Sequence, residues 1–155
     1  MIQRSSLPTN AKILFAFVAG IFVGRIIFRP TYETGPLHGS VKQLEDTPVR
    51  PTSHVDQQGK PITKQQMLEP FVVPNFVGFS VATFTAGQQL TPHEHDNLHE
   101  FFYVLEGSGV IQIDKKEHKM EPGSFFHLAP HERHGIQIPD NGSMKMAVFG
   151  VTVEK

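Results

Sequence analysis

The sequence concentrates its histidines, the residues best suited to metal binding and acid–base chemistry, in one stretch. Seven of the nine histidines lie between positions 93 and 134. His93 and His95 are two residues apart, so on an extended segment both side chains project from the same face and can reach one metal ion. Glu100 can bring a carboxylate to the same point, and His134 a third imidazole. The spacing therefore predicts a shell of three nitrogen ligands and one oxygen ligand.

Such a shell suits a divalent transition metal, namely Fe, Mn, Zn, Ni or Cu, and leaves positions open for water or substrate. The 155-residue chain has no cysteine, which excludes a thiolate metal site, a disulfide framework and a cysteine nucleophile. Fourteen basic and 15 acidic side chains give a net charge of −1. A nucleic-acid-binding protein usually carries a basic excess, so this class is not expected.

Residues 70–155 have the pattern of an all-β domain that could position these side chains. Apolar, β-branched and aromatic runs recur there between turn signals, and none shows the 3.6-residue period of an amphipathic helix. Short strands at regular spacing are typical of a sandwich or barrel. We expect strands at Phe76–Thr85, Glu100–Glu106, Gly109–Asp114, Glu117–Met120, Ser124–Leu128, Gly135–Ile138 and Met144–Val153.

The segment that holds the first three candidate ligands resembles the first motif of the cupin superfamily, G-x5-H-x-H-x(3,4)-E-x6-G. Every fixed position is matched, by Gly87, His93, His95, Glu100 and Gly107. The resemblance is to single-domain, conserved-barrel cupins, and it covers residues 76–153, about half of the chain.

The second cupin motif, G-x5-P-x-G-x2-H-x3-N, is matched in part. Gly123 stands eleven residues before His134, and Pro130 is interpreted as the proline of the motif. Glu132 is interpreted as the replacement for its glycine, so the turn before His134 is expected to differ from that of the family.

The resemblance implies a small double-stranded β-helix, or jelly-roll, barrel in which His93, His95, Glu100 and His134 hold a divalent transition metal. Such a metal serves dioxygen chemistry on enolates, Lewis-acid chemistry, or ligand recognition without a reaction. We expect a metal-dependent small-molecule enzyme of dioxygenase or lyase type. The alternative is a non-enzymatic small-molecule or sugar-binding cupin displayed on a membrane. A secreted germin-like oxidase fits less well with the divergent second motif.

Two further groups of residues are candidates for the interior of such a barrel. The acidic residues Glu94, Asp96 and Glu132 could serve as acid–base groups. The plainer interpretation is that they are solvated carboxylates on loops. An apolar cavity would favour a small, partly apolar or aromatic acid, and its expected lining is Phe84, Phe102, Phe126, Ile136 and Phe149.

Strand alternation also predicts a partner for the outer face of the domain. If Glu100 points inward, then Phe101, Tyr103 and Leu105 point outward. Three apolar side chains on an outer face need cover, and we expect a homodimer.

The N-terminal half of the chain lacks the strand pattern of residues 70–155. Ile13–Gly24 is an uncharged apolar run of 12 residues. Continued to residue 28 as a helix, it spans roughly 24 Å, a little less than a ~30 Å hydrocarbon core. No small-x-small cleavage site follows, so an uncleaved transmembrane signal anchor over residues 1–29, with a single-pass membrane location, is favoured over a signal peptide. Residues 30–69, which contain five prolines and show no sustained period, are predicted to be a linker or an irregular arm.

Overall fold

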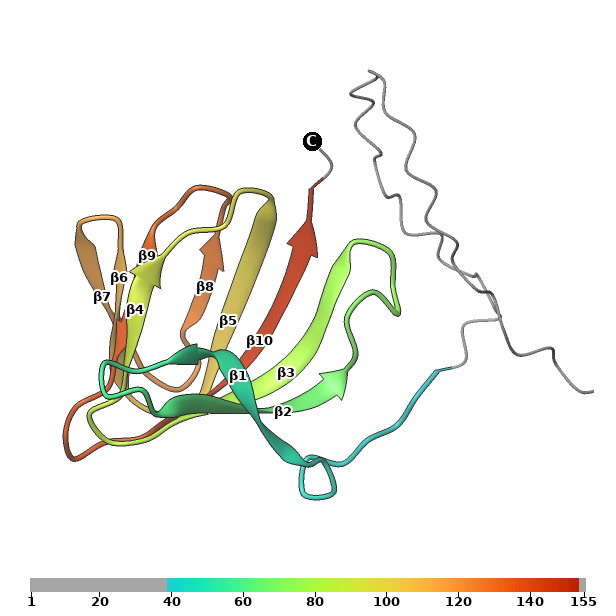
Figure 1. Cartoon of the computed structure of the whole chain (residues 1–155), viewed down its shortest axis with the longest axis horizontal. Helices are drawn as coiled ribbons and strands as arrows, with labels where there is room; N and C mark the ends of the chain where they lie inside the picture. The colour runs from blue at the N-terminus through green and yellow to red at the C-terminus, as the bar shows by residue number, and fades with distance from the viewer. Residues whose placement is uncertain (1–38, 154–155) are drawn as a thin grey trace, which may run out of the picture. The chain divides into compact units, whose positions relative to one another are not determined.

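The computed structural model describes residues 39–153, and in that range the chain forms ten strands and no helix (Figure 1). All the strand pairs are antiparallel. The strands are β1 (Val49–Val55), β2 (Pro61–Leu68), β3 (Phe76–Phe84), β4 (Gln89–His93), β5 (Leu98–Gly107), β6 (Gly109–Ile113), β7 (Lys116–Met120), β8 (Phe125–Leu128), β9 (His134–Gln137) and β10 (Met144–Thr152).

The strands form two sheets that face each other (Figure 1). The six-stranded sheet has the order β1-β2-β3-β10-β5-β8, and the four-stranded sheet has the order β4-β9-β6-β7. Strands that are distant in sequence pair in both sheets, as β3 does with β10 and β4 with β9, which is the connectivity of a jelly roll. The all-β barrel expected from the sequence is confirmed.

Alternation along the strands places the core between the two sheets. In β5, Phe102 and Val104 are buried, while Tyr103 and Leu105 between and after them are exposed. Ile111 in β6 and Ile136 in β9, which are partners in the register of the small sheet, meet this core from the other side. The interior side of the large sheet and that of the small sheet therefore share one hydrophobic core.

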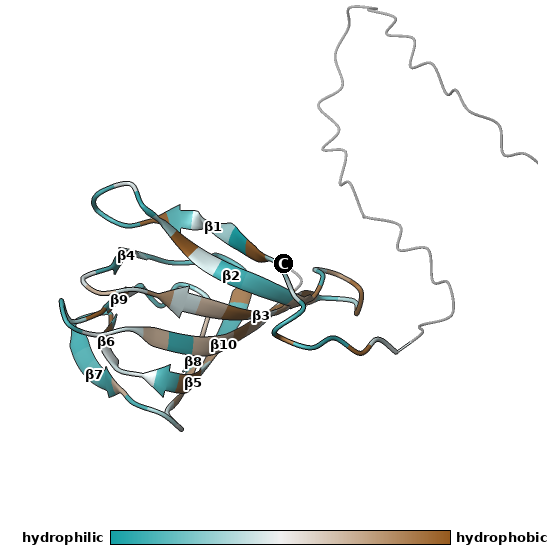
Figure 2. Cartoon of the chain, turned by 90° about the horizontal axis from the view of Figure 1, so that it is seen from below, coloured by the Kyte–Doolittle hydropathy of each residue, from teal (hydrophilic) through white to brown (hydrophobic). Residues whose placement is uncertain are grey.

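The prediction of a linker or irregular arm is wrong for residues 49–68, which form β1 and β2 at the edge of the large sheet (Figure 2). The prolines occupy places where a sheet tolerates them: Pro61 begins its strand, and Pro51 lies in the edge strand. The turn between the two strands is closed by Asp56, whose carboxylate accepts the N–H groups of Gln58 (3.0 Å) and Lys60 (2.8 Å). The two strands were not predicted because about half of the residues in each are polar and no apolar period is sustained.

The apolar run Ile13–Gly24 and the rest of the predicted anchor over residues 1–29 lie outside the described residues. Within residues 39–153, no helix is long and apolar enough to cross a membrane. The membrane anchor therefore stays a prediction.

The outer face of the large sheet carries an aromatic cluster. The ring of Phe101 stacks on Phe149 and on His127, at centroid distances of 4.9 and 4.8 Å. Tyr103 and Phe125 beside them are 42% and 56% exposed. The outward direction of Tyr103 and Leu105 is confirmed, whereas the homodimer that it suggested stays a prediction.

Candidate metal centre

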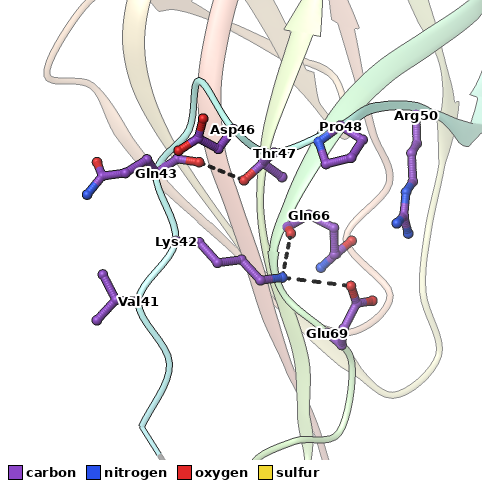
Figure 3. Close-up of a pocket in the computed structure, with 9 residues that line it drawn as sticks. All are labelled: Val41, Lys42, Gln43, Asp46, Thr47, Pro48, Arg50, Gln66 and Glu69. Atoms are coloured by element: carbon purple, nitrogen blue, oxygen red, sulfur yellow. Dashed lines mark hydrogen bonds and ion pairs between the residues drawn. The ribbon is translucent and has the colours of Figure 1, made fainter.

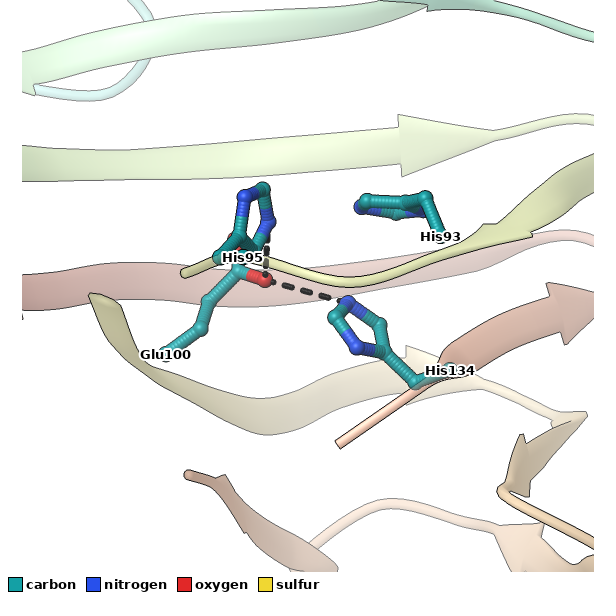
Figure 4. Close-up of side chains that lie close together, drawn as sticks. All are labelled: His93, His95, Glu100 and His134. Atoms are coloured by element: carbon teal, nitrogen blue, oxygen red, sulfur yellow. Dashed lines mark ion pairs between the residues drawn. The ribbon is translucent and has the colours of Figure 1, made fainter. Parts of the chain in front are cut away.

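Four side chains from both sheets converge at one end of the barrel (Figure 4). His93 ends β4 and pairs with His134, the first residue of β9, across the small sheet. Glu100 comes from β5 of the large sheet, and His95 from the loop between β4 and β5. One donor atom from each side chain lies within 4.8 Å of the other three. The structure thus brings together all four residues that the sequence proposed as ligands.

Backbone carbonyls fix the orientation of two of these imidazoles. Nδ1 of His93 lies 3.0 Å from the carbonyl oxygen of Thr91, and Nδ1 of His134 lies 3.0 Å from that of Glu132. A carbonyl oxygen can only accept, so each Nδ1 carries the proton and donates it. In the neutral imidazoles, the lone pair is then on Nε2. Histidines that bind metals are held in this way, by a hydrogen bond from the nitrogen that does not face the metal.

The carboxylate of Glu100 lies among the remaining ring nitrogens. Its Oε2 is 3.3 Å from Nε2 of His134 and 3.5 Å from Nε2 of His95. Neither contact has hydrogen-bond geometry, so these three buried atoms have no hydrogen-bond partner among the described residues. Buried polar atoms are rarely left without partners, and a group of this kind could hold a cation.

The pKa values of the cluster follow from burial and from this carboxylate. Burial raises the pKa of Glu100, but His134 and His95 outweigh that effect and hold the pKa at about 2. The carboxylate in turn raises the pKa of His95. Burial lowers the pKa of His93, so this imidazole is neutral near pH 7 and available as a ligand. The site is an anion surrounded by imidazoles, which is the charge pattern that a cation needs.

The turn before His134 departs from the second cupin motif at a different residue than the sequence suggested. His131, three residues before His134, has a φ of 68°, the left-handed conformation that favours glycine. The glycine of the motif therefore corresponds to His131 and its proline to Ala129, so the assignments to Glu132 and Pro130 are wrong. The N–H of His131 donates to the carbonyl oxygen of His95 (2.9 Å), which ties this turn to the loop that carries another candidate ligand.

The acidic residues proposed for acid–base chemistry lie away from the interior. The carboxylate of Glu132 accepts the N–H of Ala129 at 2.7 Å, so it stabilises the turn. Glu94 and Asp96 are exposed on the loop on either side of His95. Their plainer interpretation, as solvated loop carboxylates, fits this placement.

A cavity of about 160 Å³ opens beside His93 and Glu100. Phe84 and Phe102 line it, as expected. The expectation is wrong for the other three predicted lining residues. Ile136 is buried in the core, Phe126 packs against that core, and Phe149 stacks on Phe101 on the outer face. The inward residues of β10 that do line the cavity are Met146 and Val148.

The sequence did not suggest His54, which also lines the cavity. Its ring centroid lies 4.7 Å from that of His93, and burial lowers its pKa. His54 belongs to β1, inside the segment predicted to be a linker. The signal that could have revealed it is weak: a short extended stretch between Pro51 and the turn at Gln57.

A second, larger hollow of about 360 Å³ shares no lining residue with this cavity (Figure 3). Seven residues of the segment 41–50 line it, together with Gln66 of β2 and Glu69 just after that strand. Nζ of Lys42 lies 3.2 Å from the carbonyl oxygen of Gln66 and 4.0 Å from the carboxylate of Glu69. Because these polar groups pair with one another, we interpret the hollow as the space where the segment before β1 packs against the end of β2.

Residues 80–151 match the sequence model of the family described as Cupin domain, and this segment contains the four converging side chains. These residues form a cupin domain. A Cupin 2 conserved barrel domain protein from Salinispora arenicola has the same fold, with a TM-score of 0.59 and 18% identity over 75% of this chain and 91% of that one. The resemblance drawn from the two motifs is confirmed.

Relatives of known name are enzymes of more than one class. A 3-hydroxyanthranilate 3,4-dioxygenase from Burkholderia cenocepacia is 31% identical over 99 residues, which are 61% of this chain and 52% of the relative. The dimethylsulfoniopropionate lyase DddW from Ruegeria pomeroyi is 36% identical over 69 residues, 44% of this chain and 45% of the relative. The chain thus spans about half the length of these relatives.

Proposed function

We propose that this cupin domain is a metal-dependent small-molecule enzyme of dioxygenase or lyase type. A divalent transition metal would be held by His93, His95, Glu100 and His134. The observation that carries the proposal is the approach of Oε2 of Glu100 to Nε2 of His134 at 3.3 Å. Nδ1 of His134 holds the ring proton, so when the imidazole is neutral its Nε2 carries a lone pair. This lone pair faces a lone pair of Oε2 of Glu100.

Two buried lone pairs facing each other are unfavourable unless a cation lies near both. The donor set of three imidazole nitrogens and one carboxylate oxygen matches the preference of Fe, Mn, Zn, Ni and Cu. Fewer than six protein ligands leave room for water or substrate in the coordination shell. The residues present therefore fit such a metal.

When bound, the metal would polarise a substrate oxygen or activate dioxygen. The chain itself contributes position and exclusion of water. Thr91 and Glu132 orient two of the imidazoles through their backbone carbonyls. Phe102 closes the inner side, because its ring meets that of His134 edge-on with centroids 6.0 Å apart. The open side is the cavity beside His93, which is where a substrate would enter. The names of the dioxygenase and lyase relatives support the two reaction types.

Metal content of the purified full-length chain tests the first half of the proposal. We expect about one transition-metal ion per chain by elemental analysis and its loss in His95→Ala. His118→Ala, in the exposed strand β7, is the matched control and should keep the metal. An unchanged metal content in His95→Ala would refute the ligand assignment.

Turnover tests the second half. Oxygen uptake with enolic and aminophenolic substrates checks the dioxygenase type, and product analysis with small sulfonium and hydroxy acids checks the lyase type. Activity that falls with the metal in His95→Ala supports the proposal. A metal-loaded protein that turns over no member of either panel would contradict it and would favour the non-enzymatic binding cupin instead.

A further inference from the structure

The hairpin of β1 and β2 lies outside the cupin match at residues 80–151 and forms one wall of the cavity beside the candidate metal centre. Its edge strand contributes Thr52 and His54, and its inner strand contributes Ile62 and Lys64. This wall is the polar side of the cavity, and the family match does not determine its chemistry.

Lys64 is a basic side chain directed into an interior. Alternation along β2 places it on the same face as Ile62 and Gln66, which are 2% and 7% exposed. It pairs in register with Ala82 of β3, another residue of the cavity wall. Among the described residues, its ammonium has no hydrogen bond and no ion pair.

Four other lysines among the described residues, Lys42, Lys60, Lys119 and Lys145, do have partners. Lys60, in the turn of the same hairpin, donates to Oγ1 of Thr85 at 3.1 Å, and Lys145 pairs with Glu106 at 3.2 Å. A half-buried cation without an anion is unfavourable, so its place in a cavity is more consistent with a ligand that carries negative charge.

The rest of the cavity limits that ligand. Its volume of about 160 Å³ is close to the ~150 Å³ of an engineered cavity that admits benzene. Phe84, Leu90 and Met146 give it apolar sides. A small ligand with an apolar body and one charged group fits these walls.

A carboxylate matches the charged end better than a phosphate does. Phosphate sites generally use helix N-termini, several backbone N–H groups or arginine forks. The cavity offers one ammonium, with the hydroxyls of Ser53 and Ser80, and residues 39–153 contain no helix. One ammonium with nearby hydroxyls suits the two oxygens of a carboxylate.

We propose that the cavity binds a small organic carboxylate whose charged group pairs with Lys64 while its other end faces His93 and Glu100. The orientation of that other end rests on the proposed function. Three neutral imidazoles and one carboxylate would leave a divalent ion with one net positive charge, and Lys64 adds a second. The β1–β2 hairpin would thereby select acids over their neutral analogues.

The test compares small carboxylates with their neutral amides on the full-length protein. Benzoate, butyrate and pyruvate, each with its amide, are titrated by calorimetry into the metal-loaded and the chelator-treated protein. We expect at least one carboxylate to bind tenfold or more tightly than its amide. Lys64→Met keeps the apolar stem but removes the charge, and it should abolish this preference. Lys60→Met is the matched control and should retain it.

Metal content, measured on the same samples, separates this inference from the proposed function. A preference that depends on Lys64, in a protein that takes up no transition metal when one is added, would support the carboxylate site and overturn the metal enzyme. Equal binding of every carboxylate and its amide, or an equal preference in Lys64→Met and Lys60→Met, would overturn the carboxylate site even in a metal-loaded protein. Lys64→Gln provides a second variant if Lys64→Met does not fold.

Discussion

Replacing Glu100 with glutamine tests the electrostatics of the cluster, because glutamine keeps the shape of the side chain and removes its charge. Burial raises the pKa of Glu100, yet His134 and His95 hold it at about 2 against an ordinary 4.5. In the metal-free protein the cation beside the carboxylate is protonated His95, whose pKa Glu100 raises. At ~1.36 kcal/mol per pH unit, the lowered pKa of Glu100 then corresponds to about 3 kcal/mol of stabilisation of the folded, metal-free protein. The carboxylate is 18% exposed, so solvent screening reduces this figure little.

The depressed pKa also fixes the pH dependence of that stabilisation. The contribution is fully present above the unfolded-state pKa of about 4.5 and is lost as pH falls towards about 2. Urea unfolding with a chelator present measures it. Glu100→Gln should be less stable than the wild type by about 3 kcal/mol near pH 5, and the difference should narrow towards about pH 3.

Glu106→Gln provides the matched control in the same strand. The carboxylate of Glu106 is 66% exposed and pairs with Lys145 on the surface, where an ion pair contributes about 1 kcal/mol or less. The reasoning about the cluster is refuted if the two variants lose the same stability, or if the deficit of Glu100→Gln is constant over the pH range.

Three other predictions concern features away from the cluster. Gly107→Ala should lower stability by more than about 1–2 kcal/mol, because its φ of 77° is left-handed and its new Cβ would collide with the carbonyl of Ser143. Gly59→Ala, at a similar φ of 78° but with open space around it, should cost less in thermal unfolding. Phe125→Lys should convert a dimer to a monomer in light scattering, and a wild-type mass of one chain would contradict the dimer. Deletion of residues 1–29 should move the protein from the membrane to the supernatant fraction, and a wild type already in the supernatant would contradict the anchor.

The metal cluster could be predicted from sequence because its residues are defined by short-range spacing. His93 and His95 are two residues apart, Glu100 lies near the start of the next strand, and the structure brings His134 opposite His93 in the register of β4 and β9. Turn residues and apolar runs likewise indicated the strands of the cupin domain.

The cavity wall could not be predicted in the same way, because it depends on long-range register. Phe149 is apolar and close to the site in the barrel, but it alternates with Val148 and so faces outward. Lys64 and His54 lie in strands without an apolar period, since an edge hairpin that lines a polar cavity needs few apolar residues. Their contribution to the site appears when β2 pairs with β3.

The candidate ligands come from both sheets, so a bound metal would connect the two layers of the barrel. His93 and His134 belong to the small sheet and Glu100 to the large one. An ion bound to all of them would clamp the two layers at one end, so its binding energy would also resist their separation. Removing the metal with a chelator should therefore destabilise this end of the barrel. Amide hydrogen exchange should become faster first in β4, because β4 pairs only with β9 in the small sheet.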